Sequence, residues 1–82
     1  MSEETAMSTN ETVIYIPLLN EGTDVLRPAT GVILEPDVVR VVATRNYNPE
    51  DEEWEFLPGS TVRCVKEVHG GREILVARHR VA

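Results

Sequence analysis

The chain has 82 residues and carries 14 acidic against eight basic side chains, a formal net charge of −6. This length suffices for one domain, and the composition is typical of a globular protein rather than a disordered or collagen-like one. The net acidity argues against nucleic-acid binding by the whole surface, because phosphate binding depends on positive charge.

The first residues of the chain predict a disordered acidic tail over 1–11. This segment consists mainly of Ser, Thr, Glu and Asn, so it offers little to bury. It has no basic start and no apolar stretch, and no apolar run approaches the length that spans a bilayer. We therefore expect no signal peptide, no membrane segment and a cytoplasmic location, with one domain over residues 12–82.

Proline and glycine punctuate that domain at short intervals, and the runs between them are rich in Val, Ile and Thr. Such spacing predicts short strands joined by turns, and no run has helical periodicity. Pro17 cannot donate a hydrogen bond to a ladder, so we expect it at an edge or a strand end. The expected strands cover residues 12–18, 24–27, 31–35, 38–44, 53–57, 61–68 and 73–81.

A central hairpin is predicted around Pro36-Asp37. With that pair as the loop, Leu34 opposes Val39 and Val32 opposes Val41, so that their side chains share one apolar face. Neither loop residue readily adopts a positive φ, so a longer loop remains open as an alternative.

A second hairpin is predicted around Gly70-Gly71. A two-residue loop pairs Cys64 with Ala77, but it also places Arg63 opposite Arg78, and like charges that face each other are destabilising. A register slipped by one residue instead gathers apolar side chains on one face. We favour the slipped register.

Five to seven short strands without a helix can bury their apolar faces as two packed sheets or as a small closed barrel. We predict an all-β fold of the SH3-like barrel type. An OB-like barrel and a small sandwich are the alternatives.

An acidic cluster followed by an aromatic residue is the first candidate binding site: Glu50, Asp51, Glu52, Glu53 and Trp54. The cluster lacks the spaced oxygen ligands of a calcium loop, so it is either a solvated loop or a docking surface for a basic partner. Trp54 belongs to the core on size alone. If it were exposed beside the cluster, it would be the best interface anchor in the chain.

The charge is unevenly divided along the chain. Residues 1–57 hold 12 acidic and three basic side chains, whereas residues 58–82 hold two acidic and five basic ones. A basic face on the last hairpin is the second candidate site, for nucleic acid, through Arg63, Lys66, Arg78 and Arg80. No aromatic residue alternates with these side chains as base stacking requires. An intramolecular match with the acidic loop is the alternative.

Cys64 is the single cysteine, so neither an internal disulfide nor a zinc site of several cysteines is possible. It lies in an apolar run, which is typical of a buried, unreactive thiol. His69 is an odd number of residues away on the same predicted strand and faces the other side. We therefore predict no catalytic residues, no metal site and no cofactor.

Two segments resemble a known group of proteins: residues 18–28 (LLNEGTDVLRP) and residues 54–64 (WEFLPGSTVRC). They resemble small uncharacterised bacterial proteins that share EGTxVxRP and WxFxPGxxVxC segments. That group often has an aromatic residue at the position of Leu26. The resemblance implies bacterial origin and an all-β domain, and it brings no established activity.

The sequence leaves the function open, and we predict a small protein-interaction module without catalytic activity, which binds a partner or itself. The acidic cluster with Trp54 would be its contact surface. Nucleic-acid binding through the last hairpin is the alternative, and an enzyme built on Cys64 is a further one.

Overall fold

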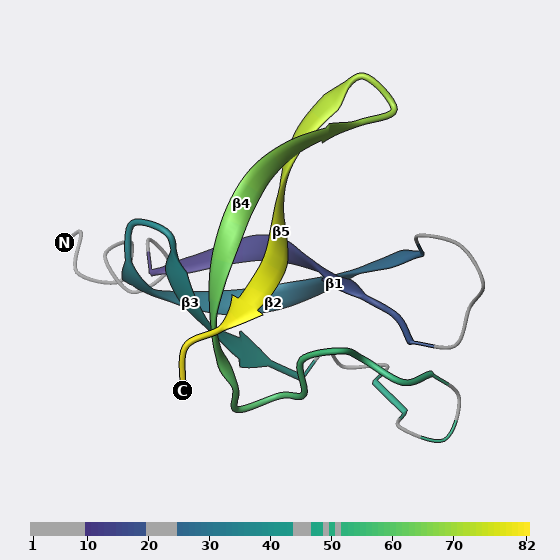
Figure 1. Cartoon of the computed structure of the whole chain (residues 1–82). Coiled ribbons are helices and arrows are strands. Elements are labelled where there is room, and N and C mark those ends of the chain that lie inside the picture. Colours follow the sequence, from purple (N-terminus) through teal and green to yellow (C-terminus); the bar gives the residue numbers. More distant parts are fainter. Residues whose placement is uncertain (1–9, 20–24, 44–46, 49, 51) are drawn as a thin grey trace, which may run out of the picture.

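The computed structural model describes residues 10–19, 25–43, 47–48, 50 and 52–82. These residues form five strands, β1 (Glu11–Pro17), β2 (Leu26–Glu35), β3 (Val38–Val42), β4 (Thr61–His69) and β5 (Arg72–Arg80). The strands close into a barrel in chain order (Figure 1). Each strand runs antiparallel to the next, and β1 meets β5 in parallel.

The predicted all-β fold is confirmed, and the barrel is of the small SH3-like type. Its consecutive strand order differs from the Greek-key order of an OB barrel. In the described ranges there is no helix with the length and apolar character needed to cross a bilayer. Residues 1–9, which hold most of the predicted tail, lie outside the described residues.

β2 joins two segments that we expected to be separate strands, and Pro28 lies inside it opposite Tyr15. β3 pairs with β2 only from Thr30 onward, so no neighbour requires the amide that Pro28 lacks. The predicted strand over residues 53–57 is wrong. Only Trp54 there forms a bridge, with Leu18, among the described residues.

The β2–β3 hairpin has the two-residue loop that we predicted, because Glu35 pairs with Val38 across Pro36-Asp37. The predicted pairing beyond the loop is wrong. A bulge between Ile33 and Glu35 places Ile33, not Leu34, opposite Val39. The extra residue of a bulge is left out of the ladder, and Leu34 is accordingly 45% exposed.

The β4–β5 hairpin turns at Gly70 and Gly71, whose φ angles are 60° and 81°. Two successive positive φ angles are those of a type I′ turn, which matches the twist of the flanking strands. Cys64 pairs with Ala77, so the slipped register that we favoured is wrong. A bulge between Arg63 and Cys64 shifts Arg63 away from Arg78 and thereby removes the repulsion that had argued against this register.

The core fills the barrel between the sheet and the segment that precedes β4. Ile14 and Ile16 of β1 are fully buried, and Trp54 and Phe56 belong to the same buried cluster. Space is tight on the inner face of β2, where a Cβ atom added to Gly31 would overlap Val39 Cγ1 and lie 3.2 Å from Ile14 Cδ1. A small barrel thus needs small residues where strands approach closely.

The β4–β5 hairpin is longer than the barrel and projects beyond the other strands (Figure 1). Cys64 and Ala77 at its base are buried in the core. Toward the turn, Val65 is 40% exposed and Val68 is 71% exposed. The projecting half of the hairpin is therefore not covered by the core.

Candidate functional site

The acidic cluster lies beside a buried tryptophan. Trp54 is 2% exposed, and its ring packs against Tyr47 at a centroid distance of 4.5 Å. Its indole N–H donates to Glu52 Oε1 over 2.8 Å. Because Trp54 belongs to the core, it cannot anchor a partner at the surface, and the candidate contact surface loses its aromatic residue.

Glu52 is engaged with other residues of the chain. The Arg27 guanidinium contacts it through Nη2, 2.7 Å from Oε2, and through Nε, 3.1 Å from Oε1. The Trp54 indole, and after it Arg27, holds the pKa of the Glu52 carboxyl below its ordinary value of 4.5. Glu50 and Glu53 are exposed, and Asp51 lies outside the described residues. The cluster thus serves in part to hold Trp54 and β2 together.

Two of the four candidate nucleic-acid contacts have carboxylate partners. Arg63 Nη1 lies 2.7 Å from Asp37 Oδ2 in the β2–β3 turn. Arg78 donates to both carboxylate oxygens of Glu67, over 2.6 Å and 2.8 Å. Lys66 and Arg80 form no ion pair with another described side chain and are exposed.

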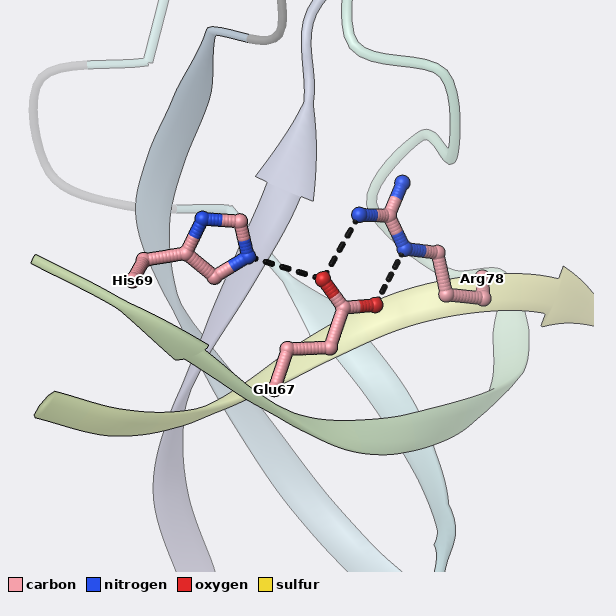
Figure 2. A network of polar contacts seen from close by, with 3 residues as sticks. All are labelled: Glu67, His69 and Arg78. Carbon is pink, nitrogen blue, oxygen red and sulfur yellow. Dashed lines mark hydrogen bonds and ion pairs between the residues drawn. The ribbon is translucent and has the colours of Figure 1, made fainter. Parts of the chain in front are cut away.

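Glu67 is the centre of a polar network on the hairpin (Figure 2). It accepts from Arg78 on one side, and His69 Nε2 lies 2.8 Å from its Oε1 on the other. An ionised carboxylate only accepts, so Nε2 is the donor. The hydrogen bonds from Arg78 and then His69 lower the pKa of Glu67 to about 2. The network links β4 to β5 on the outer face of the hairpin.

Cys64 has the environment of a structural thiol. It is 4% exposed, and burial, followed by the charge of Asp37, raises the pKa of its thiol. A reactive thiol needs the opposite shift and solvent access. His69 is bonded to Glu67 on the other face of β4. In the part of the chain that the structure describes, no group of three possible ligands could hold a metal ion.

A site that we did not predict lies at the seam where β1 meets β5. These strands pair at a single position, Tyr15 with Val76. At the C-terminal end of β1 another segment takes over its edge, since Glu55 N–H donates to Pro17 O and Leu19 N–H donates to Glu53 O. The seam is therefore sealed at this end.

At the N-terminal end of β1 no described segment covers the seam, and we call this the open end. A groove of about 390 Å³ separates β1 from β5 there. It is lined by Thr12, Val13, Tyr15, Arg72, Glu73, Ile74 and Leu75. These are the residues next to the Tyr15–Val76 bridge, so the groove takes the place of the ladder that β1 and β5 do not continue.

A smaller hollow of about 220 Å³ adjoins this groove on the outer face of the barrel. Tyr15, Arg72 and Ile74 line both spaces, and Leu26 and His69 complete the smaller one. The hollow thus has an apolar wall and two basic side chains. The sequence did not predict this hollow, because the hollow lies between the first strand and the last. No local sequence pattern indicates where a barrel closes.

Comparison with protein-family models, with curated proteins and with solved structures found no match for the chain.

Proposed function

We propose that the chain is a small protein-interaction module that binds a partner through the open end of the β1–β5 seam. The observation that carries the proposal is the groove between two strands of one barrel, each with an edge that no strand of the described chain covers there. Exposed strand edges are templates for pairing with another chain, and proteins normally cover or charge them.

The exposed side chains of the seam support this proposal. Val13 on β1 is 59% exposed, and Ile74 and Leu75 on β5 are partly exposed beside it. Apolar side chains beside unpaired main-chain groups form a surface that a partner strand covers better than water does. The acidic cluster has a weaker claim, since Trp54 is buried and Glu52 is bonded within the chain.

The experiment compares two exposed apolar positions in the full chain. Val13→Lys places a charge in the groove, whereas Leu57→Lys places one on the loop before β4, where Leu57 is 51% exposed. Bound proteins and oligomeric state are measured by affinity capture and by light scattering. We expect the unmodified chain and Leu57→Lys to show the same association and Val13→Lys to lose it.

A charge reversal of Glu50 and Glu53 tests the acidic cluster in the same assay. Association should survive this change. If the charge reversal abolished association and Val13→Lys did not, the contact surface would be the acidic cluster. No association of the unmodified chain with any partner or with itself would contradict the proposal altogether.

A further inference from the structure

We propose that the groove accepts an extended peptide segment of a partner protein, which adds as a strand along β1 and directs a carboxylate side chain to Arg72. This inference rests on the proposed function and names the class of partner. Main-chain groups of both strands that no described strand pairs, together with the side chains around the groove, support it.

The free edge of β1 follows from its pairing with β2. Main-chain groups of an antiparallel strand point to alternate edges along the chain. The carbonyl of Asn10 accepts from Ile33 N–H of β2, so every second residue after Asn10 also bonds to β2. The main-chain groups of Glu11 and Val13 therefore point away from β2, toward β5. Apart from β2, no strand of the described chain pairs with β1 at these two positions.

The facing edge of β5 follows from its turn. In a two-residue hairpin the flanking residues, here His69 and Arg72, form a hydrogen-bonded pair. The main-chain groups of Arg72 thus point to β4, and those of Glu73 point the other way, toward β1. Two strand edges whose donors and acceptors have no partner strand among the described residues border the same groove. An extended backbone satisfies such groups, whereas a helix, whose main-chain bonds are internal, does not.

The side chains around the groove define the chemistry of the peptide. Val13, Ile74 and Leu75 offer contacts to apolar side chains on alternate positions of a strand. A proline-rich helix would need a groove lined by several aromatic rings, and among the described residues Tyr15 alone of the aromatic residues lines this one.

The basic end of the groove selects for a carboxylate. Arg72 lines both the groove and the outer hollow, and it forms no ion pair with another described side chain. His69 lies in the same hollow and is bonded through Nε2 to Glu67. Among the described residues no carboxylate lines the hollow itself, whereas Glu73 lines the adjoining groove. An acidic side chain on the peptide supplies the complementary charge, and Arg binds a carboxylate with two parallel hydrogen bonds.

The test uses a defined probe and the full chain. The probe is an acetylated, amidated peptide of alternating threonine and valine with one central glutamate, and its control carries glutamine instead. Binding is followed by the backbone amide NMR signals of the protein. We expect the signals of Glu11, Val13 and Glu73 to shift most. The glutamine peptide should bind about tenfold more weakly, or by about 1.4 kcal/mol, because a hydrogen bond to a charged carboxylate is stronger than one to a neutral amide.

Two variants separate the main-chain and the side-chain contributions. Val13→Pro removes an N–H that points into the groove and leaves the β1–β2 bonds intact, so it should abolish binding. Arg72→Gln should bind both peptides equally and as weakly as the unmodified chain binds the glutamine peptide. Arg80→Gln is the matched control, because it removes an arginine outside the groove, and its affinity should not change.

Several outcomes would overturn the inference. These are no shift at the three amides with millimolar peptide, equal affinity of the unmodified chain for both peptides, and unchanged binding by Arg72→Gln. Shifts that appear with rising protein concentration alone would assign the groove to a second copy. Shifts that follow deletion of residues 1–9 would assign it to that segment. If the peptide does not bind but Val13→Lys still abolishes capture of a partner, the result contradicts this inference and leaves the proposed function supported.

Discussion

The two ends of the β1–β5 seam differ in what covers the same strand edge. At the sealed end, the segment around Trp54 forms main-chain hydrogen bonds with Pro17 and Leu19, and the Trp54 ring is buried in the core. At the open end, Glu11 and Val13 meet a groove and the hairpin is held by ionic contacts. One edge is thus hydrogen-bonded to another segment of the chain at one end and borders a groove at the other.

The largest expected effect concerns the sealed end. Trp54→Ala removes a ring that is 2% exposed, so we expect a loss of about 3–5 kcal/mol in the free energy of unfolding. The amide hydrogens of Leu19 and Glu55, which bond across the seam, should then exchange faster. Chemical denaturation and hydrogen exchange measure both effects.

Val68→Ala is the control for that change, since Val68 lies on the projecting hairpin and is 71% exposed. Its free energy of unfolding should change by no more than about 0.5 kcal/mol. Comparable losses for the two variants would mean that the sealed end does not depend on Trp54.

A second prediction concerns the inner face of β2 near the open end. Gly31 pairs with Thr12 of β1, and an added methyl group would overlap Val39. Gly31→Ala should therefore cost about 1–3 kcal/mol through overpacking. Thermal unfolding measures this loss. Thr30→Ala, on the opposite face of β2, is the control, and we expect it to lose less stability. If Gly31→Ala left the stability unchanged, the interior at this end would have room for the added methyl group.

The smallest expected effect tests the ionic contacts of the open end. The pKa of Glu67 is lowered from 4.5 to about 2 by Arg78 and His69, so its ionised form stabilises the folded state. This contribution should be fully present above about pH 4.5 and disappear as the pH falls toward 2. Because the pair is partly exposed, we expect at most about 1 kcal/mol.

The measurement is the stability of the unmodified chain against Glu67→Gln over this range of pH. The difference should shrink as the pH falls. A difference that stays constant down to pH 2 would show that Glu67 acts through its shape rather than its charge.

Local patterns carried most of the strand predictions. The Gly70-Gly71 pair marks a two-residue turn because glycine adopts the positive φ that both positions require. Alternation of apolar residues located the strands around it. The pairing registers were lost where a bulge intervened, next to Leu34 and next to Arg63. A bulge depends on how two strands must twist to close a barrel, and one strand alone does not report it.

The candidate site was less predictable than the fold. The sequence makes Glu52 and Trp54 candidates for a contact surface, with the core as the alternative for Trp54, and the structure buries Trp54 and bonds it to Glu52. No sequence pattern indicated that the edge of β1 at Val13 lacks a neighbouring strand among the described residues, since a strand with a free edge and a strand with a neighbour have similar sequences. The short-range rules of turn, alternation and charge therefore determined the fold class, the two hairpin turns and the uneven charge. Only the tertiary structure decided where the barrel closes and which part of the β1–β5 seam stays open. Both depend on contacts between the first and last strands, whose residues are distant in the chain and meet only after folding.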